Sequence, residues 1–173
     1  AADTGFPSRP ITLVIPFPPG GATDVNGRVI AQRLGKELGQ PVVVENRAGA
    51  GTVVGASYVS KAAPDGYTLL ISSGSTFTVN PAIRKTMPFD TVRDFTPVAF
   101  IGRAPLLVTT STKLPVQSAS ELFALARSKP GQITYASAGL GSINQISTEL
   151  IAFSAGVRFT HVPYKGGAPA LND

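Results

Sequence analysis

Short apolar strands and helical segments alternate along the first seventy-odd residues, and this alternation limits the fold more than any other property of the sequence. Strands are predicted at 11–16, 41–46 and 67–73, where apolar runs are short. Helices are predicted from Thr23 onward and over 49–66. This order predicts an α/β fold with a parallel sheet and helices packed on it. The first helix has apolar residues at a helical period and a glycine suited to end it: Val25, Val29, Ile30, Leu34, Leu38 and Gly39.

The alternation restarts after an irregular stretch with turns at 89–98. Two strands are predicted at 97–102 and 105–111, and a helix from about Ser118 follows them. A strand is then predicted to begin at residue 133, and a glycine-rich turn and a helix follow it. A last strand is predicted at 157–164, before the start of another helix. We therefore expect a boundary near Arg103, with an N-terminal α/β domain at 1–103 and the first part of a second at 104–173.

The charges argue against a nucleic-acid partner. The net charge is +5, but the basic residues are scattered and no basic stripe is interleaved with aromatic residues. The chain has no cysteine and one histidine, His161, and its carboxylates are not grouped, so neither a zinc site nor another metal site is expected. No apolar run approaches the ~20 residues of a membrane span. The start Ala1-Ala2-Asp3 fits the product of signal-peptide cleavage or an expression remnant.

The strand ends carry the candidate site. In an open parallel sheet, ligands lie beyond the carboxyl ends of the strands, and these ends are rich in Gly, Ser, Thr, Ala and Asn. The stretch VIPFPPGGATD (14–24) places Gly20 and Gly21 before a helix whose first N–H groups have no partners within the helix. SAGLGS (137–142) repeats this arrangement. Either the two helix N-termini hold the two ends of a dianion, or both turns are only tight connections.

Enzyme patterns are weak. The phosphate-binding loop G-x-x-x-x-G-K-[ST] is absent, GAGTVVG (49–55) has the wrong spacing for a dinucleotide, and no G-x-S-x-G is present. His161 lies inside an apolar strand, where a packed histidine is more common than a catalytic base. From its position alone, Asp24 is better explained by capping than by catalysis. No cofactor is expected.

Six stretches together form a recognisable pattern: FPSRPITLVIPFPPGGATD, LGQPVVVENRAGAG, AAPDGYTLL, DFTPVAFIGRAPLLV, YASAGLGS and HVPYKGGAPALND. In this order, from about Phe6 to Asp173, they resemble the Bug (TctC-like) family, the periplasmic solute-binding proteins of tripartite tricarboxylate transporters. The resemblance implies a periplasmic-binding-protein-like (Venus flytrap) fold with two α/β domains of parallel or mixed sheet. It also implies that a small carboxylate binds in the cleft between them.

The family's ligand-binding positions are carried over by motif. The resemblance implies binding by Phe17, Gly21, Ala22, Thr23, Asp24, Ser72, Ser73, Gly74, Ser137, Ala138, Gly139, Gly141, Ser142, Gln145 and Tyr164. Lys165 borders the cleft. The sequence departs from the family at Leu140 and at SINQ (142–145), which replaces a frequent Ser-Pro-Ser-His type run. Both departures fall where the ligand is chosen, so its identity does not carry over; Leu140 weakly favours a less polar ligand.

Family members continue well past residue 173, so we expect a fold truncated at its C-terminus that associates with another chain or is poorly soluble. The resemblance predicts a periplasmic protein, not an enzyme, that binds an amino acid, a dicarboxylate or an aromatic acid for a membrane permease or a sensor. The alternatives are an α/β enzyme acting on a phosphorylated or acyl substrate, and a signalling partner that binds another protein.

Overall fold

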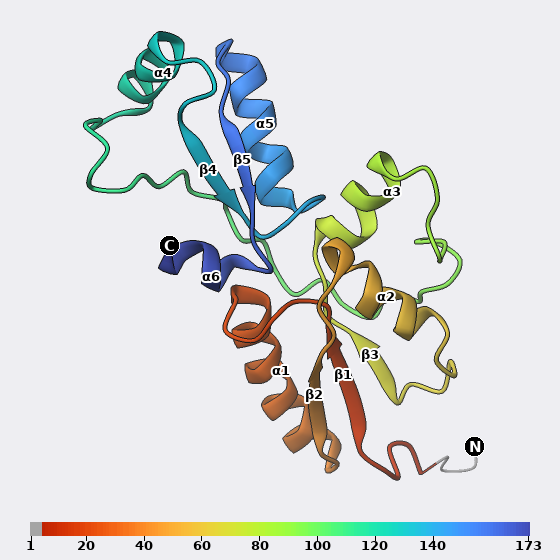
Figure 1. Ribbon diagram of the computed structural model, residues 1–173. Helices are drawn as coiled ribbons and strands as arrows, with labels where there is room; N and C mark the ends of the chain where they lie inside the picture. The colour runs from red at the N-terminus through yellow and green to blue at the C-terminus, as the bar shows by residue number, and fades with distance from the viewer. Residues whose placement is uncertain (1–4) are drawn as a thin grey trace.

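The protein has two separate parallel β-sheets, each with helices packed against it (Figure 1). The computed structural model describes residues 5–173, so the predicted processing site at residues 1–3 lies outside the described residues. The first sheet has the order β2-β1-β3 and the second pairs β4 with β5. The strands are β1 (Ile11–Ile15), β2 (Val42–Asn46), β3 (Thr68–Leu70), β4 (Thr134–Ser137) and β5 (Thr160–Pro163). The predicted α/β alternation with parallel sheets is confirmed.

The helices connect these strands in the predicted order. They are α1 (Ala22–Leu38), the 3₁₀ turn η1 (Ala50–Thr52), α2 (Val53–Ser60), the π-helical turn η2 (Ser75–Val79), α3 (Asn80–Ile83), α4 (Ala119–Ser128), α5 (Ile143–Ala155) and α6 (Gly167–Asn172). The predicted end of α1 at Gly39 is confirmed by its left-handed backbone, and a left-handed glycine, Gly156, also ends α5. Of the helices described, none is long and apolar enough to cross a bilayer.

The face of α1 that packs on the sheet differs from the prediction. Val25 and Val29 are 54% and 49% exposed, whereas Gly27 and Ala31 are buried. A Cβ at Gly27 would lie only 2.5 Å from Cδ1 of Ile15, so the helix backbone approaches β1 closely. Small residues therefore form the contact, and a period counted only on large apolar residues misses it.

Several elements are shorter than predicted. The helix expected over 49–66 is regular only over Val53–Ser60, because Gly51 and Thr52 have positive φ angles of 65° and 87°. The strands expected at 67–73 and 157–164 contract to β3 and β5. The core of the first sheet includes Leu13, Ile15, Ala31 and Ile71, whereas Val53 and Ala56 of α2 belong to a separate cluster with Phe89.

The two strands predicted at 97–102 and 105–111 are wrong. Residues 97–110 form no regular secondary structure in the described chain and run as a connection between the two sheets (Figure 1). A strand needs a neighbouring strand for its hydrogen bonds, and neither sheet pairs with this segment. Its apolar side chains are therefore exposed, with Phe100 at 79% and Leu107 at 83%. The domain boundary near Arg103 stays a prediction.

Candidate functional site

The carboxyl ends of the strands in both sheets point toward the same region between the sheets (Figure 1). Loops from the two sheets meet there. A Cβ at Gly166, after β5, would lie 2.8 Å from Cγ of Pro18, which follows β1. The backbone N–H of Ile143, at the start of α5, donates a hydrogen bond to Ser75 Oγ at 3.0 Å. Each residue predicted to bind the ligand lies at the end of a strand, in the loop that follows it or in the first turn of the next helix.

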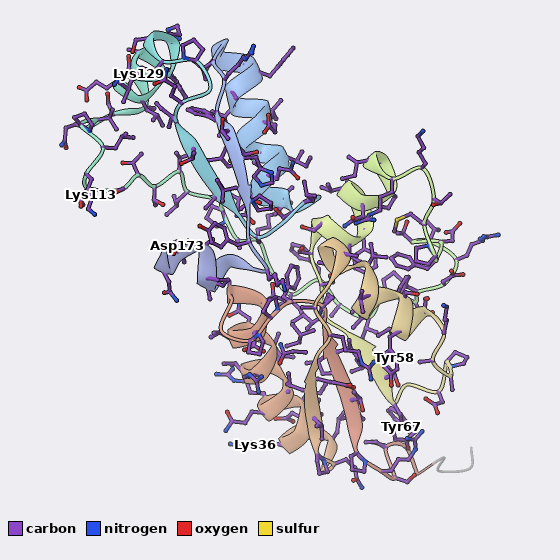
Figure 2. All side chains as sticks on the ribbon, viewed as in Figure 1. Lys36, Tyr58, Tyr67, Lys113, Lys129 and Asp173 are labelled. Atoms are coloured by element: carbon purple, nitrogen blue, oxygen red, sulfur yellow. The ribbon has the colours of Figure 1, made fainter. Side chains whose placement is uncertain are left out.

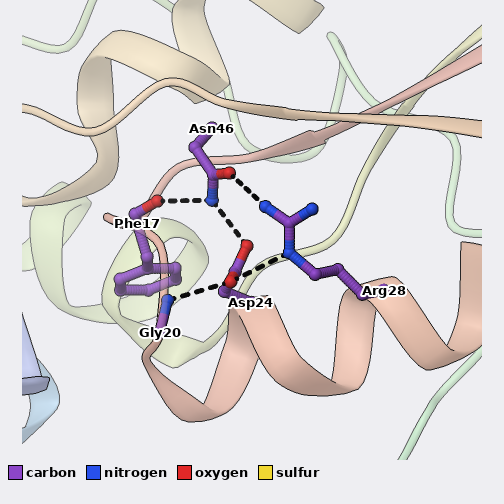
Figure 3. A network of polar contacts seen from close by, with 5 residues as sticks. All are labelled: Phe17, Gly20, Asp24, Arg28 and Asn46. Atoms are coloured by element: carbon purple, nitrogen blue, oxygen red, sulfur yellow. Dashed lines mark hydrogen bonds and ion pairs between the residues drawn. The ribbon is translucent and has the colours of Figure 1, made fainter.

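The loop after β1 is organised by a buried carboxylate (Figure 3). Asp24 is 3% exposed, and its Oδ2 accepts hydrogen bonds from the Gly20 backbone N–H at 2.9 Å and from Arg28 Nε at 3.1 Å. Its Oδ1 accepts from Asn46 Nδ2 at 2.8 Å, and the same amide nitrogen donates to the Phe17 carbonyl at 3.0 Å. Both oxygens of Asp24 thus hold the protein's own loop and fix the path of residues 17–20.

This network keeps Asp24 ionised. The hydrogen bond from Arg28 is the largest cause that lowers the pKa of Asp24, from the usual 3.8 to about 2. Burial acts in the opposite direction, and the bonds from Gly20 and Asn46 outweigh it together with Arg28. Arg28 also donates to Asn46 Oδ1 at 2.9 Å, so its guanidinium is engaged within the protein.

The N-terminus of α1 has no capping side chain. The residue before the helix, Gly21, has extended backbone angles (φ −79°, ψ 167°) and makes no side-chain hydrogen bond. Gly20 precedes it with a φ of +86°, a conformation that favours glycine. The first N–H groups of α1, which belong to Ala22 and Thr23, therefore lie at a helix end whose dipole favours an anion.

Hydroxyl groups line the loop after β3. Ser72 Oγ contacts Thr76 Oγ1, which donates to Thr52 Oγ1 at 2.7 Å, and both threonines are buried. Ser73 Oγ accepts from the Ser75 N–H at 3.3 Å, and Gly74 is exposed. The predicted residues Ser72, Ser73 and Gly74 thus form a tight turn supported by Thr52 and Thr76.

The loop after β4 is held by the single histidine. Ser137 Oγ lies 2.6 Å from His161 Nε2 and also accepts from the Gly139 N–H at 3.1 Å. His161 stacks on the Tyr135 ring with centroids 4.9 Å apart. Burial is the largest cause that raises the pKa of Tyr135, and the hydrogen bond from its hydroxyl to the Glu149 carboxylate raises it further. The histidine therefore packs and hydrogen-bonds within the second sheet, as its position in a strand predicted.

The start of α5 differs from that of α1 because side chains accept hydrogen bonds from several of its N–H groups. Ser142 Oγ accepts from the Gln145 N–H at 3.3 Å, and Gln145 Oε1 accepts from the Gly141 N–H at 2.8 Å. The Ile143 N–H is taken by Ser75. The two helix N-termini are therefore not equivalent, and α1 offers the freer one.

Tyr164 makes its contact with the last helix. Its hydroxyl donates to the Asp173 carboxylate, whose place at the end of α6 is labelled in Figure 2. This hydrogen bond is the largest cause that raises the pKa of Tyr164. The backbone N–H of Tyr164 donates to the Ser137 carbonyl at 3.1 Å, which ties the two strand ends together.

Sequence reasoning missed four buried polar residues at this site. Asn80 is fully buried, and its Nδ2 donates to the carbonyls of Gly51 and Ser75, each at 2.6 Å. Ser75, Thr52 and Thr76 were also not predicted. The partners of these side chains come from distant loops, so the sequence near each residue does not indicate its role. The one local indication was that Asn80 precedes Pro81. Among residues 5–173, no group of three or more His, Cys, Asp or Glu side chains is placed to hold a metal ion.

Comparison with known proteins shows the family of this chain. The model of the TctC family, described as "Tripartite tricarboxylate transporter family receptor", matches residues 27–173. Protein BugT of Bordetella pertussis (strain Tohama I) is 44% identical over 174 residues, which cover 100% of this chain and 53% of BugT. The chain spans about half the length of the curated relatives it matches.

Two solved structures that match the fold are complexes with small dicarboxylates. "R. palustris Rpa4515 with adipate" is 43% identical with a TM-score of 0.94, covering 97% of this chain and 56% of that one. "MatC (Rpa3494) from Rhodopseudomonas palustris with bound malate" is 36% identical with a TM-score of 0.90, covering 96% of this chain and 57% of that one. These likenesses confirm the periplasmic-binding-protein-like fold. With the family match over most of its length, the chain belongs to the TctC (Bug) family of receptors, which are solute-binding proteins and not enzymes.

Proposed function

We propose that this protein captures a small carboxylate between its two sheets, and that a dicarboxylate is the favoured class. The observation that carries the proposal is the uncapped N-terminus of α1, which lies beside the rigid Asp24 network at the meeting point of the strand ends. The adipate and malate complexes of two structural neighbours support the dicarboxylate class. An amino acid or an aromatic acid belongs to the wider class that the resemblance implied.

In this proposal, backbone N–H groups take the place of an arginine clamp. One carboxylate of the ligand accepts hydrogen bonds from the first turn of α1, at Gly21, Ala22 and Thr23, where the helix dipole favours negative charge. Arg28 and Arg84, which contact the neighbouring loops, are both hydrogen-bonded within the protein. Ser72, Ser73 and Gly74 complete the first side of the site. Asp24 acts as a positioning residue, because its carboxylate holds the loop.

The second carboxylate meets the other sheet, where the remaining predicted positions lie. These are Ser137, Ala138, Gly139, Gly141, Ser142 and Gln145, with Tyr164 at the edge. Approach of the two sheets around the ligand removes water from both carboxylates and strengthens their hydrogen bonds. We place this event in the periplasm, where the loaded protein delivers its ligand to a membrane permease or a sensor.

Isothermal titration calorimetry tests this function. Adipate, malate, glutamate and benzoate are titrated into the protein, and 1,6-hexanediol serves as a neutral control of the same length as adipate. We expect at least one dicarboxylate to bind and the diol not to bind. If no acid of the panel binds, or if the diol binds as well as adipate, the proposal is wrong. Turnover of a bound acid during incubation would favour the enzyme alternative.

A further inference from the structure

A part-buried hydrogen bond connects the loops of the two sheets outside the predicted ligand positions. Ser75, in η2, is 2% exposed, and its Oγ accepts the N–H of Ile143 at 3.0 Å. The two residues are 68 positions apart in the chain. Ile143 is the first residue of α5, so its N–H has no partner within the helix. The Ser75 hydroxyl therefore supplies the acceptor that this helix end requires.

The backbones on both sides approach closely at this bond. A Cβ at Gly51 would lie 2.6 Å from the Leu140 carbonyl oxygen, which is too close for any side chain. A Cβ at Gly141 would lie 3.1 Å from Asn80 Oδ1 and 3.2 Å from Cδ1 of Ile83. Glycine thus allows the turn at 139–142 to lie against η1 and α3.

Asn80 makes the first side of this contact rigid. Its amide nitrogen holds the carbonyls of Gly51 and Ser75 together, and its Oδ1 accepts from Arg84 Nε at 2.7 Å. Arg84 also donates to the Ala50 carbonyl at 2.7 Å. The acceptor Ser75 is therefore fixed in place, whereas its donor belongs to the other sheet.

We propose that Ser75 is a positioning residue that holds the turn at 139–142 and the start of α5 against the first sheet. The bond sets the separation between the predicted ligand positions of the first sheet, at 17–24 and 72–74, and those of the second sheet, at 137–145 and 164. Its effect on ligand binding rests on the proposed function, but its effect on the arrangement of the two sheets does not. The bond also depends on residue 143, because a proline there, as in the Ser-Pro-Ser-His type run, would have no N–H.

Spin-label distances test the contact without any ligand. The chain has no cysteine, so Lys36→Cys in α1 and Lys129→Cys after α4 can be labelled without background. Both lysines are exposed, and Figure 2 shows Lys36 beside the first sheet and Lys129 beside the second. Ser75→Ala removes the acceptor and Ile143→Pro removes the donor, and proline is well suited to the first position of a helix. Thr78→Ala, which removes an exposed hydroxyl from the same turn, is the matched control.

We expect Ser75→Ala and Ile143→Pro each to add a population at longer distance, and the double variant to resemble either single variant. Thr78→Ala should match the parent. A distance distribution for Ser75→Ala that superimposes on the parent's overturns the proposal, as does a double variant whose effect is the sum of the two. If Ser75→Ala fails to fold, Ile143→Pro removes the same bond from the other side and decides the question.

Surface plasmon resonance with adipate measures the effect on binding. Loss of one hydrogen bond formed only when the two sheets are together should raise the dissociation rate roughly three- to tenfold. The association rate should match that of Thr78→Ala. Equal changes in both rates would indicate a merely structural role and contradict the proposal. If adipate and the other acids do not bind the parent, the proposed function fails, while the distances still decide the role of Ser75.

Discussion

Among single residues, Asp24 has the most complete set of contacts in the candidate site. Five hydrogen bonds join it and its partner Asn46 to each other and to Gly20, Arg28 and Phe17, and the carboxylate is almost fully buried. A buried charge is tolerated only where such partners compensate for lost water. The resemblance assigned Asp24 to ligand binding, whereas its position predicted a capping role. Its contacts instead hold the loop at residues 17–20, and its part in ligand binding stays a prediction.

Asp24→Asn should destabilise the protein by about 2 kcal/mol at pH 7, because the pKa of Asp24 is about 2 in the folded protein and near its usual 3.8 when unfolded. The asparagine side chain would also point an NH₂ group, which cannot accept a hydrogen bond, at groups that donate to Asp24. Since the folded pKa is the lower one, the advantage of the parent is present above about pH 4 and declines as the pH falls toward 2. Urea unfolding at several pH values measures it.

Glu37→Gln is the matched control for that measurement. Glu37 is exposed on the same helix, and a surface substitution of this kind should change the free energy of unfolding by less than about 0.5 kcal/mol. If Asp24→Asn costs no more than Glu37→Gln at pH 7, or if its cost does not change with pH, then Asp24 does not organise the loop as described.

At the scale of elements, the start of α1 is the part that the proposed function requires. Its N–H groups have no capping side chain, whereas those of α5 are taken by Ser75 and Ser142. A glycine N-cap such as Gly21 costs only about a few tenths of a kcal/mol relative to a Ser or Asp cap. An anion bound at Gly21–Thr23 would offset that loss.

Ala22→Pro removes one of these donors with little harm to the helix. Ala22 is exposed, it is the first residue of α1, and the preceding Gly21 is extended, as a residue before proline prefers to be. Loss of one hydrogen bond to a charged group should weaken adipate binding roughly ten- to hundredfold. Calorimetry measures this, with Ala22→Ser, which keeps the N–H, as the control. Equal affinity of Ala22→Pro and Ala22→Ser would show that this N–H does not bind the ligand.

The order of elements was predictable from local patterns. Apolar residues that recur every two residues in strands or every 3.6 residues in helices, and glycines at helix ends, are recognised within a few neighbouring residues. The strand ends, and hence the loops of the site, followed from that order. The face of α1 and the roles of Ser75 and Asn80 were not predictable in this way. Gly27 packs on Ile15 from another element, and Ser75 meets a partner 68 residues away. Residues 97–110 had a strand pattern but lack a partner strand.

At the scale of the whole molecule, the connection between the sheets exposes an unusual amount of apolar surface. Val98, Phe100 and Leu107 are 84%, 79% and 83% exposed, within a segment that has no ladder hydrogen bonds. Extended apolar segments with unpaired backbone groups favour pairing with another chain. We therefore expect this protein to self-associate.

Sedimentation velocity tests this expectation. The average mass should rise with concentration above that of one chain, and the double variant Phe100→Ser/Leu107→Ser should reduce the rise because it removes apolar contact area. The double variant Thr109→Ala/Thr110→Ala, in the same exposed segment, should behave as the parent does. A parent that sediments as a monomer at every concentration would contradict the prediction.

Backbone amide spectra of the ¹⁵N-labelled protein during titration with adipate test the carboxylate site most directly, because they observe the proposed donors themselves. We predict that the amide proton signals of Gly21, Ala22 and Thr23 move downfield and saturate with adipate, and that 1,6-hexanediol leaves them in place. Saturable binding of adipate that leaves these three signals unmoved, while the largest changes fall at arginine or lysine side chains, would contradict the account.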